Sequence, residues 1–261
     1  MPWSTDSVKP TVTLVIPARY GSSRFPGKPL VDLLGKPMIQ YVYEQAAACP
    51  AISDVLVATD DRRIQSAVEA FGGRALLMAE PYRTGTDRVA GVARRQEGAY
   101  FVDLQGDEIL LRPDLITDLV EPFLTSGAPM GTLKRQIHST EDLRNPGCVK
   151  VTTDHEGNAL YFSRAPIPLV RDDPQQAATP GLHYIHLGLY IYSRETLLRL
   201  ADLPSGRLEE AEKLEQLRAL EYGIRIRVWE TKHASIRIDV PDDVPAALEA
   251  LRRHDTARCV S

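Results

Sequence analysis

The chain alternates short apolar runs with segments whose apolar residues recur at helical spacing, and this pattern is clearest in its first 125 residues. Residues 11–16 are β-branched and apolar without polar alternation, as buried parallel strands are, and further short strands are expected at residues 55–58, 76–78 and 100–104. Between them, apolar residues fall three or four positions apart, and Gly72 and Gly73 suit the end of one such helix. This βαβα rhythm predicts a parallel sheet with helices on both faces.

The pattern changes after residue 125, where short strands outnumber helices. Strands are expected at residues 131–136, 149–153, 159–163, 187–192 and 224–230. Residues 209–222 (EEAEKLEQLRALEY) are expected to form one helix, and another is expected after residue 243, with Leu248 and Leu251 on its apolar face. We therefore expect one domain over residues 1–261, with a first half (11–125) and a more antiparallel second half (126–261).

A loop of cations and small residues follows the first strand. Residues 11–30 read TVTLVIPARYGSSRFPGKPL, in which Pro17 is expected to end the hydrogen-bond ladder of the strand. The loop then carries Arg19, Arg24 and Lys28. Ligands of open α/β sheets bind outside the carboxyl ends of the strands, and forked guanidinium groups with a lysine suit phosphate. The sequence therefore predicts a polyanion site in this loop.

Two common phosphate-binding loops do not fit these residues. A P-loop reads G-x-x-x-x-G-K followed by Ser or Thr, whereas five residues separate Gly21 from Gly27 here and Pro29 follows Lys28. A G-x-G-x-x-G dinucleotide fingerprint does not occur after this strand either. From the residues alone, a solvated basic loop remains the alternative.

Acidic residues follow the fourth strand, where residues 105–108 read QGDE. A carboxylate pair just past a strand end can hold a hard cation that bridges phosphates. Asp107 can equally be a turn or cap residue, and Asp239 can be the cap of the last helix.

The composition of the chain limits the classes of partner that it can bind. The net charge of −4 and pI near 5.9 give no global basic field for nucleic acid or an anionic membrane, so any anion site must be local. Apolar runs are far shorter than the ~20 residues of a membrane span, and the first ten residues lack a signal-peptide core, so we expect a soluble cytoplasmic protein. Cys49, Cys148 and Cys259 are scattered and odd in number, which predicts free thiols.

The loop at residues 17–30 resembles the signature loop of the 3-deoxy-manno-octulosonate cytidylyltransferases, or CMP-KDO synthetases. Their pattern, P-A-R-x-x-S-x-R-x-P-G-K-P-L, is matched at every fixed position. Further blocks follow in the family's order: VATDD (57–61), TGTDR (84–88), QGDE (105–108), YFSRAPIP (161–168), HLG (186–188) and LEQLR (214–218). The resemblance therefore covers residues 11–251.

This resemblance implies a nucleotide-diphospho-sugar transferase fold, which is a Rossmann-like three-layer α/β sandwich with a smaller mixed-strand lobe that pairs a homodimer. It also implies a reaction. The anomeric hydroxyl of KDO, an eight-carbon 2-keto sugar acid, or of a close analogue attacks the α-phosphorus of CTP with Mg²⁺ bound, and pyrophosphate is released. Such an enzyme supplies lipopolysaccharide biosynthesis.

By the same resemblance, the site residues fall into three groups. The catalytic group is Lys28, Arg19, Asp107 and Asp239, with both aspartates as magnesium ligands. CTP is expected at Ala18, Arg19, Arg24, Lys28, Thr84, Thr86, Asp87, Arg88 and Gln105. The sugar acid is expected at Gln105, Arg164, His186, Glu215, Gln216 and Arg237. His186 can instead be a core histidine, and Glu215 and Gln216 can be ordinary helix positions.

Two departures from the family pattern leave the acceptor open. Ile109 stands where the family has proline, and residues 234–244 (ASIRIDVPDDV) replace the glycine-rich P-G-T-G-V-D-T-P-E-D-L. Loss of these glycines, together with the added cation of Arg237, changes what fits beside the metal. KDO, another ulosonate or a phosphonate remain possible acceptors. The alternatives are a sugar-1-phosphate nucleotidyltransferase and a catalytically silent nucleotide-binding protein.

Overall fold

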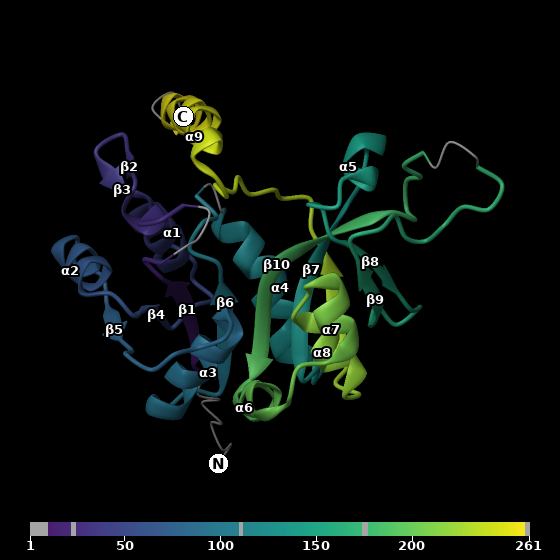
Figure 1. The fold of residues 1–261 in the computed structure, drawn as a ribbon, viewed down its shortest axis with the longest axis horizontal. Helices are drawn as coiled ribbons and strands as arrows, with labels where there is room; N and C mark the ends of the chain where they lie inside the picture. The colour runs from purple at the N-terminus through teal and green to yellow at the C-terminus, as the bar shows by residue number, and fades with distance from the viewer. Residues whose placement is uncertain (1–9, 22–24, 110–111, 174–176, 259–261) are drawn as a thin grey trace, which may run out of the picture.

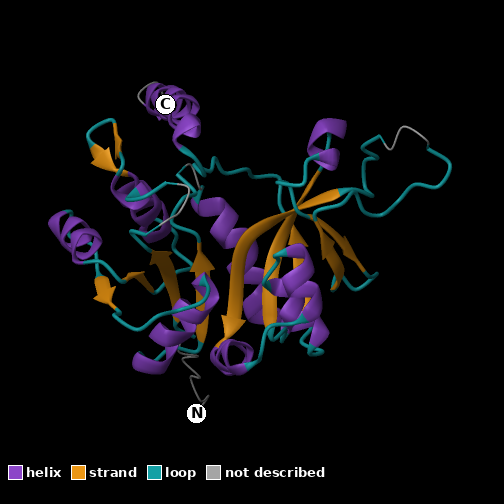
Figure 2. Ribbon diagram, viewed as in Figure 1, coloured by secondary structure: helices purple, strands orange, loops and turns teal. Residues whose placement is uncertain are grey.

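One mixed β-sheet runs through both halves of the chain in the computed structural model (Figures 1 and 2), which describes residues 10–21, 25–109, 112–173 and 177–258. Its strand order is β11-β7-β10-β6-β1-β4-β5. The first half supplies four parallel strands, which are β5 (Ala75–Leu77), β4 (Asp54–Thr59), β1 (Val12–Ala18) and β6 (Tyr100–Leu104). The parallel sheet predicted from the apolar runs is confirmed.

The second half extends this sheet with mainly antiparallel pairing. Strand β10 (Tyr184–Ser193) is antiparallel to both β6 and β7 (Met130–Gln136), and β11 (Ile226–Glu230) is parallel to β7. A hairpin of β8 (Lys150–Thr153) and β9 (Ala159–Ser163) attaches to β10. The β6–β10 pairing joins the two halves, so they share one sheet.

Helices cover both faces of the sheet because β1 buries alternate residues on opposite sides. Leu14 and Ile16 pack with buried residues of α1 (Met38–Ala47), α2 (Arg62–Ala70) and α4 (Pro113–Ser126). Val15 packs on the other side with residues of α3 (Gly85–Arg95), α6 (Arg194–Asp202) and α8 (Gln216–Glu221). The three-layer α/β sandwich that the family resemblance implied is therefore present.

The sequence predicted that Pro17 ends the first strand, and this prediction is wrong. The strand continues to Ala18, which pairs with Thr59 of β4. On the other side, the pairing with β6 stops at Val15 and Asp103. Pro17, which has no N–H to donate, therefore lies beyond the β6 ladder while β4 still follows the strand to its end. This leaves the β1–β6 junction open at the position where a ligand was expected.

The prediction of a single helix over residues 209–222 is wrong. The chain forms two helices, α7 (Arg207–Glu212) and α8, separated by a break at Lys213, whose φ of 53° is left-handed. Arg218 donates to Glu209 across this break. Side chains nine positions apart do not meet on a straight helix, so the break is what brings this charged pair together.

The last part of the chain returns from the second half to the first (Figure 1). After β11 it crosses to η2 (Pro241–Asp243) and α9 (Val244–Arg258), whose Ala247 and Leu251 pack with Leu33, Ile109 and Ile238. Asp239 is thereby placed beside the loop that follows β1. Within the described residues, no helix combines the length and apolar character that crossing a membrane requires.

The remaining elements are short. They are η1 (Lys28–Leu30), β2 (Asp32–Leu33), β3 (Lys36–Pro37) and α5 (Thr140–Arg144). Cys49 and Cys148 are free thiols, as predicted, and Cys259 lies outside the described residues.

Candidate active site at the ends of the parallel strands

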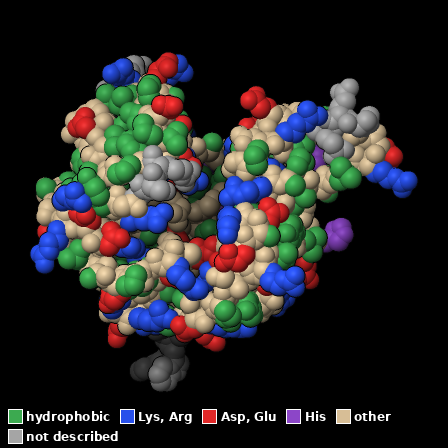
Figure 3. Space-filling view, viewed as in Figure 1, with side chains coloured by type: hydrophobic (Ala, Val, Ile, Leu, Met, Phe, Trp, Pro, Cys, Tyr) green, Lys and Arg blue, Asp and Glu red, His purple; other side chains and the backbone are tan. Residues whose placement is uncertain are grey.

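Two adjoining pockets lie where β1 and β6 end, and they share Pro17, Ala18, Arg19 and Gln105. The first, here called the α3 pocket, is completed by Tyr82, Arg83, Thr84, Gly85 and Arg88. The second, the Asp107 pocket, is completed by Lys28, Pro29, Met38, Gly106, Asp107 and Arg237. Lys, Arg, Asp and Glu side chains gather around the hollow between the two halves (Figure 3). The polyanion site predicted after β1 therefore corresponds to a real concave surface.

The loop after β1 is shaped by a glycine that packs under Tyr20. Gly27 has a φ of 71°, and its N–H donates to the Tyr20 carbonyl at 2.9 Å. The positive φ favours glycine, and a Cβ at this position would also lie tightly against the Tyr20 side chain, at 3.1–3.2 Å. The loop then turns into η1 and brings Lys28 back over the end of β1. Arg24 lies outside the described residues.

Lys28 joins two carboxylates from distant parts of the chain. Its Nζ lies 2.6 Å from Asp107 Oδ2 and 3.7 Å from Asp239 Oδ1, and it donates to the Ile238 carbonyl at 3.0 Å. Arg237 reaches the same pair, with Nε 3.3 Å from Asp107 and one terminal nitrogen 3.3 Å from Asp239. The structure therefore brings together four of the residues that the sequence proposed: Lys28, Asp107, Asp239 and Arg237.

These carboxylates fit the binding of a hard divalent cation. Asp107 Oδ1 is buried and has no hydrogen-bond partner among the described residues, so it offers a bare anionic oxygen. The described part of the chain holds no group of three or more acidic, histidine or cysteine side chains placed to bind a metal. Mg²⁺ usually takes one or two carboxylates and completes its shell with water and substrate phosphates, which is what this pair allows.

The α3 pocket is built on the N-terminus of α3. Thr84 caps the helix by accepting the Asp87 N–H at 3.1 Å, and it donates to Glu215 at 2.6 Å. Arg88, one turn later, lines the pocket and pairs with Asp60 at 2.8 Å. The helix dipole and Arg88 together favour an electron-rich ligand here. Thr84 and Arg88, two of the residues expected to bind CTP, thus both line this pocket.

Thr86 and Asp87 point away from this pocket, and neither lines it. The Thr86 hydroxyl donates to Asp103 at 3.2 Å, and Asp87 pairs with Arg83 at 3.0 Å. Both were expected to contact CTP directly. Because they are the second and third residues of α3, they face the protein interior while Thr84 and Arg88 face the cleft, and they support the pocket from behind.

Asp103 is a buried acid that sequence reasoning missed. It accepts hydrogen bonds from Thr86 and from the Gln105 amide, the latter at 3.0 Å. Burial raises the pKa of Asp103 to about 8. Since Gln105 lines both pockets, Asp103 fixes the side chain at their junction. The sequence feature that could have identified Asp103 is a carboxylate within an otherwise apolar strand, YFVDL.

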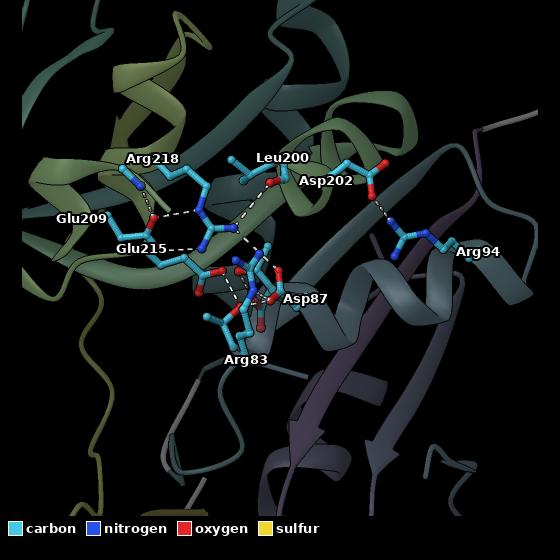
Figure 4. Close-up of polar contacts among 12 residues, drawn as sticks. Arg83, Asp87, Arg94, Leu200, Asp202, Glu209, Glu215 and Arg218 are labelled. Atoms are coloured by element: carbon cyan, nitrogen blue, oxygen red, sulfur yellow. Dashed lines mark hydrogen bonds and ion pairs between the residues drawn. The ribbon is translucent and has the colours of Figure 1, made fainter. Parts of the chain in front are cut away.

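A second buried set ties α7 and α8 to α3 (Figure 4). Arg218, with only 1% of its side chain exposed, donates its Nε to Glu209 at 2.8 Å and lies 3.7 Å from Asp87. Burial raises the pKa of the neighbouring Glu215, which accepts from Thr84. Glu215 is thus held at the rear of the α3 pocket. Neither Arg218 nor Glu209 had been singled out for a role from the sequence.

His186 is a core residue, which is the alternative to a ligand-binding role that the sequence left open for it. It is buried, with its ring packed between Phe162 and Tyr190, and its Nε2 lies 3.0 Å from the Thr132 hydroxyl. Burial lowers the pKa of His186 to about 3, which keeps the ring neutral. It lines neither pocket, so its expected contact with a sugar acid is not supported by this arrangement.

Arg164 and Gln216 also lie outside both pockets. The Arg164 guanidinium donates to the backbone carbonyls of Glu212, Pro146 and Lys213, which occupy its forked donors. Gln216 is buried at the start of α8. The expected sugar-acid residues that do reach this site are therefore Gln105 and Arg237 in the pocket walls, with Glu215 behind Thr84.

Comparison with known proteins fits this geometry. Residues 13–226 match a family model described as "Cytidylyltransferase". The chain is a member of this family. The match runs from β1 to the start of β11 and includes all residues of the α3 pocket, and it ends before Arg237 of the Asp107 pocket, Asp239 and α9.

Relatives matched over nearly their whole length cover more than nine tenths of this cytidylyltransferase. It is 49% identical to the 3-deoxy-manno-octulosonate cytidylyltransferase of Trichlorobacter lovleyi, over 93% of this chain and 99% of the relative. The enzyme of the same name from Geobacter sulfurreducens is 50% identical, over 92% and 99% of the two chains. This identity covers nearly the whole of each relative.

Solved structures support the fold. A CMP:2-keto-3-deoxy-manno-octonic acid synthetase complexed with CTP has a TM-score of 0.87 and 40% identity, covering 94% of this cytidylyltransferase and 99% of that chain. A putative glucose-1-phosphate thymidylyltransferase from Bacillus anthracis has a TM-score of 0.61 at 14% identity, covering 93% and 95%, and shows the shared fold alone.

We predict that the Arg218–Glu209 pair is needed for stability, whereas a surface pair beside it is not. Removing one partner of a buried ion pair leaves an uncompensated charge, so Arg218→Ala should lower the free energy of unfolding by about 3–5 kcal/mol. Arg94, which pairs with Asp202 at the surface (Figure 4), is the control, and Arg94→Ala should cost about 0–1 kcal/mol. Urea unfolding followed by circular dichroism measures both. Equal losses of unfolding free energy in the two variants would contradict the prediction that the Arg218–Glu209 pair is needed for stability.

Proposed function

We propose that this chain is a CMP-KDO synthetase, which joins CMP from CTP to the anomeric hydroxyl of KDO and releases pyrophosphate. The observation that carries the proposal is the meeting of Lys28, Asp107 and Asp239 at the open end of β1. Nucleotidyl transfer depends on positioning the phosphates and on neutralising the charge that they carry, and these residues supply a cation and two hard oxygen ligands for that purpose. Near 50% identity to curated enzymes of that name supports CTP and KDO as the substrates.

The two pockets divide the substrate between them in this proposal. The nucleoside of CTP lies in the α3 pocket, against Thr84 and Arg88. The triphosphate runs past Arg19 toward Lys28 in the Asp107 pocket. Lys28 then stands where charge develops on the leaving pyrophosphate. Ala18 and Gln105, which line both pockets, contact the nucleotide at their junction.

Asp107 and Asp239 would hold Mg²⁺ at this site. When bound, the ion neutralises charge on the α-phosphate and lowers the pKa of a hydroxyl that coordinates it. The protein's part is to bring the two carboxylates together, and Lys28 contacts both. Gln105 remains as a partner for acceptor hydroxyl groups, with Asp103 fixing its side chain, and Glu215 positions Thr84.

A homodimer is part of the proposal, and the second half carries the support for it. Leu160 on β9 is 62% exposed, and Leu169 in the following loop is 73% exposed. Leu182, near the start of β10, is 40% exposed. These three leucines belong to one stretch of the chain, residues 160–182, and exposed apolar side chains that gather on a surface are typical of contacts with another chain. Residues 126–261 would then serve both acceptor binding and pairing.

The experiment that tests this function is pyrophosphate release from CTP with a panel of acceptor acids. KDO should support turnover at least tenfold above other ulosonates and phosphonates, with Mg²⁺ required and CTP preferred over UTP and dTTP. Faster turnover of UTP or dTTP with a sugar 1-phosphate would point instead to a sugar-1-phosphate nucleotidyltransferase. CTP binding in calorimetry without pyrophosphate from any acid would identify a silent nucleotide-binding protein.

We predict that Asp107→Asn and Asp239→Asn each lower kcat about 10²- to 10³-fold, because each removes a charged oxygen ligand from the cation. Circular dichroism should show an unchanged fold. Asp242→Asn is the matched control, since Asp242 is exposed in the same segment, and its kcat should stay within about twofold of wild type. If Asp239→Asn kept the wild-type kcat, Asp239 would not bind the metal and would serve only as a cap near the last helix.

A further inference from the structure

The two departures from the family pattern touch one another in the fold. The Ile109 N–H donates to the Ile236 carbonyl at 2.9 Å, a bond that a proline at position 109 could not make. The Ile238 N–H returns a bond to the Asp107 carbonyl at 3.1 Å, so residues 236–238 pair with residues 107–109 as a short antiparallel bridge. Ile109 and Ile238 are both fully buried in one cluster with α9. The altered segment is therefore a fixed edge of the site.

This edge fixes the backbone of Arg237 directly across from Glu108 and beside Asp107. The side chain then spans the acidic pair, because two different nitrogens of its fork lie 3.3 Å from Asp107 and 3.3 Å from Asp239. A planar guanidinium suits two such contacts, whereas a lysine offers one point charge. Burial alone would lower the pKa of Arg237, but Asp107, Asp239 and Glu108 raise it, so the group is charged.

Arg237 is also free to leave the pair. Its side chain is 51% exposed, in contrast to 14% for Lys28, which additionally donates to the Ile238 carbonyl. An exposed arginine loses little when it exchanges two carboxylate contacts for water. Among the described side chains, Lys28 and Arg237 contact these carboxylates, and Arg237 is the one that can be displaced at small cost.

We infer that Arg237 is a built-in counter-ion of the metal site: it holds Asp107 and Asp239 together while no divalent cation is bound, and a divalent cation displaces it. The inference rests on the proposed function, because that function assigns the metal to these two aspartates. It adds a feature of this chain's own sequence, since the resembling family has a glycine-rich segment here. The metal then competes with a side chain, and the chain requires a higher free Mg²⁺ concentration than one without Arg237.

The inference predicts opposite effects on the metal-free and metal-bound protein. Without metal, removal of Arg237 leaves Asp107 and Asp239 together with Lys28 as the remaining contact among the described cations, so like-charge repulsion should destabilise the fold. With metal, the competing cation is gone, so the ion should bind more tightly. A residue that only filled space would not show this reversal.

Mn²⁺ binding to the dialysed protein, without nucleotide or acceptor, tests the inference by electron paramagnetic resonance of the free ion. Arg237→Gln, which removes the charge but keeps a polar side chain and ordinary backbone freedom, should lower the Kd for Mn²⁺ about fivefold. Arg237→Lys should lie between wild type and the glutamine variant. Arg94→Ala removes an arginine from a surface pair outside both pockets and should leave the Kd unchanged.

Thermal unfolding of the same proteins supplies a second readout. Arg237→Gln should melt below wild type in EDTA and should gain more than wild type from saturating Mg²⁺. A Kd for Mn²⁺ that is equal or weaker in Arg237→Gln, or undetectable in both proteins, would overturn the inference. Unchanged Mn²⁺ binding with weakened CTP binding would do so as well, and would make Arg237 a phosphate contact.

These outcomes are separate from those of the proposed function. Pyrophosphate release from CTP and KDO at saturating Mg²⁺ does not depend on how tightly the metal-free site binds an ion. The function can therefore hold while Arg237 proves irrelevant to the metal. Conversely, tighter Mn²⁺ binding by Arg237→Gln would stand even if KDO were not the acceptor.

Discussion

The structure depends on holding two like charges side by side. Asp107 follows β6, and Asp239 precedes the last helix, yet both contact the same lysine and the same arginine. Two carboxylates repel one another, so they stay together only where cations and the backbone enforce it. Lys28 comes from the loop after β1, and Arg237 comes from the returning C-terminal segment. Three distant parts of the chain thus meet at one electrostatic junction.

Much of the fold can be understood as support for this junction. The parallel strands bring the β1 loop and the end of β6 to one edge of the sheet, as open α/β sheets do. Helix α9 buries Ala247 and Leu251 against Ile109 and Ile238, which seats the segment that carries Asp239. On the other side of Gln105, the buried acids Asp103 and Glu215 fix the α3 pocket through Thr86, Gln105 and Thr84. Apolar packing therefore positions charges that would otherwise separate.

The sequence predicted the parallel sheet and the β1 loop because both depend on local patterns. Apolar runs without alternation identify buried strands, and a run of matched positions such as PGKPL identifies a loop with its chemistry. It could not predict the break at Lys213, since residues 209–222 have good helical periodicity and the contact between Glu209 and Arg218 that the break allows is a tertiary one. Tertiary pairing overrode local propensity there.

The same limit applies to the site. His186 and Arg164 lie in family-like blocks, but burial of the first and carbonyl contacts of the second are visible only in three dimensions. Asp103 was missed because one acid in an apolar strand has no recognisable spacing. The contact between Ile109 and the segment around Ile236 could not be predicted either, since the two departures lie far apart in the sequence and join through one backbone hydrogen bond.

The most direct measurement is a crystal structure of this chain with CTP and Mg²⁺. The account predicts the nucleoside against Thr84 and Arg88, the triphosphate beside Arg19 and Lys28, and the ion on Asp107 and Asp239. A cytidine bound outside the α3 pocket, or an ion held by neither aspartate, would contradict the central claim that these two carboxylates organise nucleotidyl transfer.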